Sequence, residues 1–438
     1  MEWFEALAVM FGCLIAIMLT GMPISFAFMF TCVMGASLFW GGWVGLDQLA
    51  MSFFSSVASY TLLPIPLFVL MGDVIFSSGT GTTIVGAVDK LLGKLPGRLS
   101  LLSIGSGVLL GTMIGISGGS IGILGRVLVP EMLARGYKPE MVYGPIVSSG
   151  ALAILIPPSA MAVFLGAIGQ VSVGKLLMGI IVPGLLLAVL FAAYIIIRCK
   201  INPSLAPIYD VEKVPTREKI KSFVYYILPI GIVIVAVIGS VFLGIATPSE
   251  SAALGVIACI ILAALYRKLT WKMLFHSGMS CVRVTVMVFF IVVGSISFSR
   301  ILATTGAITE LVDLTTGLDI NPIWIIILTQ IILIFCGMFM DPASIVMITA
   351  PIFFPLAQAL GYDLIWFGVI SLLNIQLGLI SPPFGLDVYT MKAVAPKDVS
   401  LGTVFRSSMP YLGLGLLLMV LLLFVPEIAT WLPSVTGK

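Results

Sequence analysis

The sequence contains 438 residues, of which 60% are hydrophobic and 9% are charged, and its formal net charge is +3. So few charged residues cannot cover a soluble globule with polar surface, and we therefore predict an all-α polytopic membrane protein. A bilayer core about 30 Å thick needs roughly 20 apolar residues per helix, and the apolar segments suit about ten to twelve crossings or re-entrant pieces.

The residue types argue against several classes of activity. His276 is the only histidine, which argues against a histidine-based metal site or a Ser-His-Asp triad. The chain has no HExxH motif, and its GKLP and GKLL segments lack the Ser or Thr that ends an ATP-binding loop. No filter ring or charged pore indicates a channel. We therefore expect no enzyme activity, no cofactor and no nucleic-acid partner.

The cysteines are scattered through mostly apolar segments and form no CxxC pair, so we predict that they serve as small packing residues. They are Cys13, Cys32, Cys199, Cys259, Cys281 and Cys336.

The N-terminal stretch MEWFEALAVM carries Glu2 and Glu5, and no basic residue precedes Lys90. A signal peptide has a positive n-region, which this stretch lacks. We therefore expect the first apolar run to be a retained helix.

The next notable feature is GTMIGISGGSIGILG, Gly111 to Gly125, where glycines and serines punctuate an apolar background. Glycine supplies the dihedral freedom of a hairpin tip and lets a ligand approach the backbone. Close packing of helices through glycine is the competing interpretation. We predict a re-entrant hairpin whose tip spans residues 117 to 120.

Two adjacent prolines follow in LAILIPPSAM, within a run from Met141 to Gly174 that has no charged residue. Each proline removes a backbone donor and clashes with the preceding turn, so the pair predicts a broken helix. In hydrocarbon such a break is tolerated only where protein or a wet cavity supplies hydrogen-bond partners. A kink that serves packing alone is the alternative.

Residues 201 to 221 form the most polar stretch, and we predict that it is a cytoplasmic linker, because basic residues gather on that side. The basic residues in and beside it are Arg198, Lys200, Lys213, Arg217, Lys219 and Lys221.

Two apolar segments, about 222 to 243 and 248 to 266, lead from this linker to the basic loop YRKLTWK. The matching loop of the first half, GGWVGLDQ, contains Asp47 and no basic residue. Equivalent loops are therefore expected on opposite sides, as in an inverted-topology repeat. The acidic N-terminus would then lie outside.

Sliding the sequence on itself supports such a duplication. An offset of 225 aligns Pro23 with Pro248, Pro130 with Pro355, Pro157 with Pro382, Pro158 with Pro383 and Gly136-Tyr137 with Gly361-Tyr362. An offset of 227 aligns Gly79 with Gly306 and Pro183 with Pro410.

The second half repeats both interruptions. GMFMDPASIVM, Gly337 to Met347, places Asp341 and Pro342 inside a membrane segment, and we predict a second tip at residues 342 to 345. LGLISPPFGL, Leu377 to Leu386, repeats the double proline. An intramembrane Asp costs roughly 2.5 to 3.5 kcal/mol on insertion scales, so Asp341 is a functional candidate. Paired breaks at equivalent positions point to a binding site near the bilayer midplane.

The motifs GMFMDPASIVMITAPIFFPLAQALG, WFGVISLLNIQLGLISPPFGLDVY, SGGSIGILGRVLVPEMLARGY, GALAILIPPS and GIATPSESAALG together resemble a known family. They are similar to the large membrane subunit (DctM-like M subunit) of tripartite ATP-independent periplasmic (TRAP) transporters, over essentially the whole chain. The resemblance implies an elevator-type transporter driven by a sodium gradient. It also implies two partners: a small four-helix membrane subunit and a periplasmic binding protein that delivers a small organic anion.

The resemblance implies a division into two inverted repeats joined by the linker. Scaffold and arm helices would occupy about 1 to 95 and 222 to 320, and a hairpin with a broken helix would occupy about 98 to 195 and 322 to 425. The repeats themselves would span 1 to 200 and 222 to 438. The location would be the bacterial inner membrane, with both termini periplasmic.

The resemblance also implies two sodium sites, in which backbone oxygens supply most ligands. Site 1 would comprise Ser117, Ser120, Ala153, Ile156 and Pro158. Site 2 would comprise Pro342, Ile345, Gly378, Ser381 and Pro383. In many relatives the first tip carries an Asp, where this chain has Arg126, and glycine stands where this chain has Ala153.

The substrate would lie between these sites, where the N-termini of half-helices favour an anion. The candidates are Gly118, Gly119, Ser159, Asp341, Asn374, Pro382 and, as possible counter-charges, Arg126 and Arg300. Asn374 could instead join two helices, and either arginine could pair with an acid or extend to the interface. We interpret Glu250, Arg283 and Asp387 as structural or interfacial. A binding-protein-independent sodium/carboxylate symporter with the same elevator fold is the alternative function.

Overall fold

The computed structural model describes residues 3–93, 95–115, 117–207, 215–317 and 320–435. All regular secondary structure in these residues is helical. Within the described ranges, eight helices are long and apolar enough to cross a membrane, or nine if the bent pair Pro139–Leu155 and Ala160–Ile168 is one span. Shorter apolar helices add to them, which confirms the predicted all-α membrane architecture.

The first half contains α1 to α11 and a 3₁₀ turn, η1 (Tyr60–Leu62). The helices are α1 (Trp3–Leu19), α2 (Ile24–Phe39), α3 (Trp43–Val57), α4 (Pro64–Ser77), α5 (Thr80–Leu91), α6 (Arg98–Ile114), α7 (Ser117–Ala134), α8 (Pro139–Leu155), α9 (Ala160–Ile168), α10 (Val173–Gly179) and α11 (Ile181–Ile201).

The second half follows a 3₁₀ turn, η2 (Pro203–Leu205). Its helices are α12 (Thr216–Ser222), the π-helical turn η3 (Phe223–Ile227), α13 (Leu228–Phe242), α14 (Pro248–Leu265), α15 (Trp271–Thr304), α16 (Ala307–Thr316), α17 (Pro322–Phe339), α18 (Pro342–Ala359), α19 (Leu364–Ile380), α20 (Leu386–Val394), α21 (Leu401–Phe424) and α22 (Glu427–Val435). Helix α12 begins inside the expected linker, because TREKIKS follows Pro215 with residues that favour helix.

The repeat in the sequence is also a repeat of helices. The hairpin α6–α7 and the broken helix α8–α9 correspond to α17–α18 and α19–α20. Gly79 and Gly306, which align in the sequence, both take positive φ angles (65° and 76°) where α5 and α16 begin. The peptide bonds Pro157–Pro158 and Pro382–Pro383 are both cis.

Contacts at the two ends of α15 show that the halves run in opposite directions. At its end, Thr304 accepts a hydrogen bond from the indole of Trp40, in the α2–α3 turn (2.8 Å). The equivalent α14–α15 turn lies at the start of this helix of 34 residues, where Lys268 donates to the carbonyl of Gly79 (3.0 Å). Equivalent turns therefore lie at opposite ends of the scaffold.

The halves differ in one scaffold helix. Helix α15 is continuous, whereas its first-half counterpart is interrupted between Val57 and Pro64 to give α3 and α4. Pro64 and Pro66 stand at the start of α4, and neither has an N–H with which to continue a helix that precedes it. The stretch from Trp271 to Thr304 contains no proline, so nothing comparable breaks α15.

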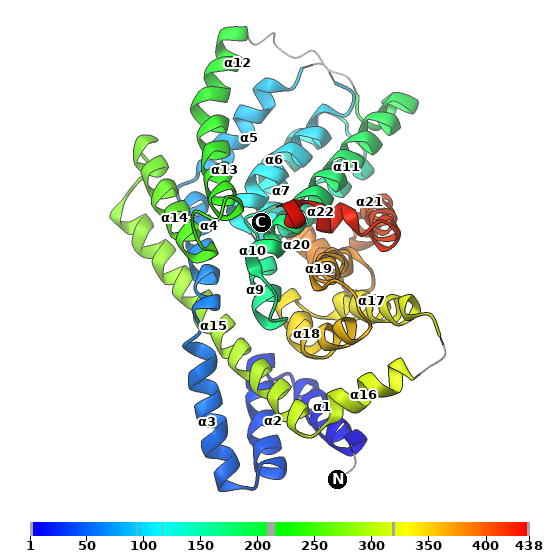
Figure 1. The fold of residues 1–438 in the computed structure, drawn as a ribbon. Helices are drawn as coiled ribbons and strands as arrows, with labels where there is room; N and C mark the ends of the chain where they lie inside the picture. The colour runs from blue at the N-terminus through cyan, green and yellow to red at the C-terminus, as the bar shows by residue number, and fades with distance from the viewer. Residues whose placement is uncertain (1–2, 94, 116, 208–214, 318–319, 436–438) are drawn as a thin grey trace.

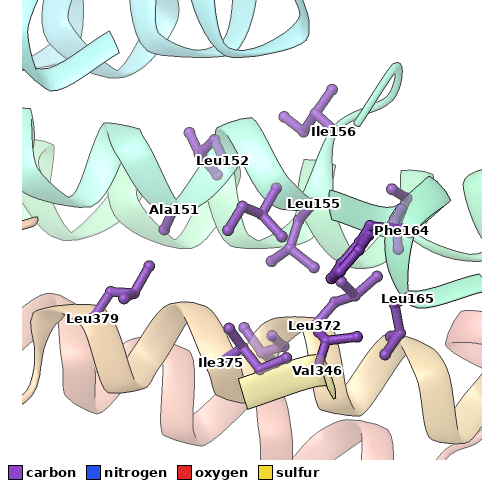
Figure 2. Packing of buried hydrophobic residues seen from close by; sticks show 14 of the residues in the cluster. Ala151, Leu152, Leu155, Ile156, Phe164, Leu165, Val346, Leu372, Ile375 and Leu379 are labelled. Atoms are coloured by element: carbon purple, nitrogen blue, oxygen red, sulfur yellow. The ribbon is translucent and has the colours of Figure 1, made fainter. Parts of the chain in front are cut away.

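Figure 1 shows two groups of helices: α1 to α4 and α13 to α15 run along one side, and the hairpins and broken helices form a compact group beside them. The two broken helices meet in the buried core of that group, where Ala151 and Leu155 of α8 lie on the side of Leu372 and Ile375 of α19 (Figure 2). This packing brings the two broken helices together in one buried core.

Candidate functional site

The first hairpin tip packs against the first broken helix. Gly111 lies so close to α8 that a Cβ there would sit 2.8 Å from the Cα of Ala153. A Cβ on Gly150 would sit 3.3 Å from the side chain of Ser117, at the start of α7. The described part of this tip therefore reaches the break.

The first break leaves backbone oxygens without helical partners. The last regular helical bond of α8 runs from the N–H of Ile156 to the carbonyl of Leu152 (2.9 Å). The carbonyl of Ala153 would accept the next bond from residue 157, which is a proline and has no N–H. Ser159 caps the following helix by accepting a bond from the N–H of Ala162 (3.3 Å).

Two serine hydroxyls from this tip point into the buried interior. Ser117 and Ser120 are 5% and 0% exposed, respectively. The Ser120 hydroxyl oxygen has no hydrogen-bond partner among the described residues. Buried polar atoms are normally paired, so this oxygen is available for a ligand.

The second tip also packs against its break, through the last turn of α17. Gly337 and Gly378 touch through their backbones, since a Cβ on Gly337 would sit 2.7 Å from the Cα of Gly378. The N–H of Gly385 donates to the carbonyl of Met338 (3.4 Å).

The backbone of the second break is more fully bonded. The carbonyl of Gly378 accepts a bond from the N–H of Ser381 (3.0 Å). The hydroxyl of Ser381 donates to the carbonyl of Leu377 (2.7 Å), and the Ile345 carbonyl accepts a bond from Thr349 (2.7 Å). Pro342 begins α18 and is half-buried, and Pro383 is exposed. A ligand at these carbonyls would use their second lone pairs.

A buried carboxylate joins the two halves at the first tip. Asp387, in the first turn of α20, is 3% exposed. Its two oxygens accept hydrogen bonds from the Ser117 hydroxyl (2.7 Å) and from the Gln376 amide (2.8 Å). Asp387 therefore holds the first tip to the second broken helix. The sequence indicated only a structural or interfacial role for it.

Asn374 joins two helices in this structure. Its side-chain amide donates to the backbone and side-chain oxygens of Gln330 on α17, the latter at 3.1 Å, and Asn374 is 2% exposed. The interpretation as a helix-to-helix hydrogen bond, left open above, therefore describes the arrangement present here, and a substrate would have to displace Gln330.

Asp341 is exposed and caps α18 by accepting hydrogen bonds from the backbone N–H (3.1 Å) and the hydroxyl of Ser344. A cap explains an intramembrane carboxylate without a substrate.

Neither arginine is placed at the breaks by its contacts. Arg300 donates to Ser52 (2.9 Å) and Ser55 (3.2 Å) of α3, in the scaffold. Arg126 is exposed on α7, nine residues beyond Ser117. The expected counter-charge for an anion is therefore not supplied by Arg300 in this arrangement, because its guanidinium is engaged with serine hydroxyls.

The other expected substrate residues lie at both breaks. Gly118 and Gly119 occupy the half-buried first turn of α7, and a Cβ on Gly118 would sit 3.7 Å from the Thr390 hydroxyl. Ser159 is fully buried beside Pro158, whereas Pro382 is exposed. The expected substrate residues thus divide between the enclosed first tip and break and the more open second tip and break.

Comparison with known proteins identifies the family. A model of the family described as "Tripartite ATP-independent periplasmic transporter, DctM component" matches residues 11–428. The C4-dicarboxylate TRAP transporter large permease protein DctM of Rhodobacter capsulatus is 31% identical, with 98% of this chain and 99% of that protein covered. Its namesake from Pseudomonas aeruginosa is 30% identical, with 89% and 90% covered.

A solved structure shares the fold. The YdaH transporter of Alcanivorax borkumensis aligns with a TM-score of 0.64 and 15% identity, over 93% of this chain and 99% of that one. The two DctM proteins are named as large permeases and YdaH as a transporter, and none of the three is an enzyme by name. The chain belongs to the DctM family, the large membrane permeases of tripartite ATP-independent periplasmic transporters.

Proposed function

We propose that this permease imports a small organic anion, a carboxylate, sialic acid or sulfonate, together with sodium ions. The hairpins and broken helices would move as one unit against the scaffold, in an elevator mechanism. The compact packing of α8 against α19 supports a rigid moving unit (Figure 2).

The proposal depends on the free oxygens at the first tip and break. Sodium takes about five or six oxygen ligands, and broken helices can supply carbonyls for it. A buried, unpartnered Ser120 hydroxyl lies on the tip, and the Ala153 carbonyl is freed by Pro157. We assign site 1 to these oxygens with those of Ser117, Ile156 and Pro158.

By the repeat, site 2 would use oxygens of Pro342, Ile345, Gly378, Ser381 and Pro383. The close contact of Gly337 with Gly378 supports this, since it brings the second hairpin onto the second break. The anion would lie between the two sites, near the first turns of α7 and α9, whose N-terminal ends favour negative charge.

The proposal extends to location and partners. The basic residues around the linker favour a cytoplasmic position for it, and so an inner-membrane protein whose termini face the periplasm. A small four-helix subunit would complete the membrane part, and a periplasmic binding protein would deliver the anion. The family described above supports these partners, because its transporters are tripartite.

Uptake into proteoliposomes tests the proposal. The permease and its small subunit are reconstituted, and uptake of the anion is measured with an inward sodium gradient and with choline in place of sodium. We expect uptake only with sodium and only when the binding protein is added. Equal flux in choline would contradict sodium coupling. Equal flux without the binding protein would favour the binding-protein-independent symporter.

A further inference from the structure

A carboxylate buried at membrane depth needs a positive partner or a strong reason to be there. Asp387 is 3% exposed, and no salt bridge to it is found among the described residues. In the described part of the chain, its oxygens accept hydrogen bonds from two neutral groups, the Ser117 hydroxyl and the Gln376 amide. Its negative charge is therefore uncompensated by the side chains that touch it.

The opposite imbalance exists at site 1. Every ligand assigned to that site is neutral: two serine hydroxyls and three backbone carbonyls. A sodium ion placed there would bring a buried positive charge without a charged ligand, which is as costly as a buried unpaired carboxylate. The negative charge of Asp387 and the positive charge of the sodium ion would compensate each other.

Ser117 connects the two. A hydroxyl has one donor and two acceptor lone pairs, so Ser117 can donate to Asp387 and still offer its oxygen to a cation. A carboxylate that accepts a bond from a ligand also makes that ligand a better acceptor and fixes its direction.

A second observation points to the same place. Ser117, Ser120, Gln376 and Asp387 form a buried polar cluster in which Ser120 lies one turn of α7 beyond Ser117. Two buried oxygens of this cluster, those of Ser120 and of the Gln376 side-chain amide, have no hydrogen-bond partner among the described residues. Gln376 is fully buried, and its amide lies against the carboxylate that it bonds. The cluster therefore contains one negative charge and two unsatisfied acceptors, which together favour a cation.

We infer that Asp387, from the second repeat, is a positioning residue that supplies the counter-charge for a monovalent cation at site 1, in the first repeat, through Ser117. The inference rests on the proposed sodium site 1. Sodium bound at one tip would then act directly on the broken helix of the other half, because Asp387 stands in the first turn of α20.

Thermal unfolding of the purified full-length chain tests this without transport. The melting temperature is followed through a sodium titration at constant ionic strength, with choline as the replacement ion. We expect sodium to raise the melting temperature of the unmodified chain. Asp387→Asn and Asp387→Ser both remove the charge, and each should need roughly tenfold more sodium for half of the shift. Asp47→Asn removes an exposed charge on α3 and should match the unmodified chain.

A purely structural Asp387 would behave differently. Its variants would melt lower by the same amount at every sodium concentration, with an unchanged half-point, and that result would overturn the inference. Ser120→Ala separates the two levels: if it shifts the half-point and the Asp387 variants do not, site 1 stands and the counter-charge fails. If no protein responds to sodium, or Ser120→Ala leaves the half-point unchanged, site 1 fails and the inference fails with it.

Discussion

Pro157 and Pro158 of the first break are buried, whereas Pro382 and Pro383 of the second are exposed, although both pairs interrupt equivalent helices. The first break is enclosed because α8 packs against α6, α7, α19 and α21. The second tip and break reach the surface with Phe339 and Phe384, whose rings lie 5.5 Å apart. The double-proline break is therefore enclosed in one half and open in the other.

The halves also differ in how they treat charge. The second tip carries its own carboxylate, Asp341, which is exposed and used as a helix cap. The described part of the first tip has no acid and instead contacts Asp387 of the other half. The carboxylate at the enclosed first tip thus comes from the second half of the chain, and its hydrogen bond links the two halves.

The largest effect is expected where a tip touches a break through backbone. Gly337→Val would place a side chain within 2.7 Å of the Gly378 Cα, which cannot move independently of α19. Overpacking of this kind typically costs about 1 to 3 kcal/mol and occasionally more, and backbone on both sides leaves no room here, so we expect little folded protein and no uptake. Gly231→Ala is the control, because nothing lies within 4 Å of a Cβ there. Normal yield and uptake for Gly337→Val would show that the second tip is loosely held.

A smaller effect is expected at the bond between α19 and α17. Asn374→Ala leaves oxygens of Gln330 without their donor, which costs roughly 1 to 3 kcal/mol. A double-mutant cycle with Gln330→Ala, measured by chemical unfolding, should show coupling between the two residues. Additive losses, with uptake lost only in the Asn374 variant, would instead favour a substrate contact.

The difference in exposure predicts a difference in thiol labelling. In a background without the native cysteines, Phe384→Cys replaces a side chain that is 49% exposed, and Ile156→Cys replaces one that is 6% exposed. We expect a polar maleimide to label position 384 at least about tenfold faster, since a buried site reacts only when the structure opens. Equal rates would mean that the first break is also open.

The smallest effect is expected at the cap of α18. Asp341→Ala removes the acceptor for the Ser344 N–H and should cost about 1 kcal/mol of stability. Asp341→Asn should retain most of it, because an amide oxygen also caps a helix. If Asp341 contacts substrate as well, Asp341→Ala will impair uptake more than Asp47→Ala does. Similar uptake in these two alanine variants would leave the cap as its whole role.

The sequence predicted the breaks well because their cause is local. Proline lacks an N–H in any fold, so Pro157 and Pro382 predict broken helices from the sequence alone. The repeat of prolines and glycines likewise predicted which helices correspond. The interruption between α3 and α4 has a local signal too, Pro64 and Pro66, but its absence from α15 could be seen only by comparing the halves.

The contacts that define the site could not be predicted in the same way. Ser117 and Asp387 are separated by 270 positions, and only the packing of α7 against α20 brings them together. Asn374 and Arg300 are substrate candidates in the sequence because they are polar groups among apolar residues. In the structure, Asn374 instead donates to Gln330 on another helix. Arg300 donates to Ser52 and Ser55. A polar residue in a membrane helix shows that a partner exists, and the fold decides which one.

Equilibrium binding of radioactive sodium to the purified chain tests the central claim most directly. The account predicts saturable binding that choline does not displace, and a higher sodium concentration at half-saturation for Ser120→Ala than for the unmodified chain, because site 1 would lose a buried ligand. Absence of saturable binding, or an unchanged isotherm for Ser120→Ala, would contradict the claim that the first tip and break hold sodium.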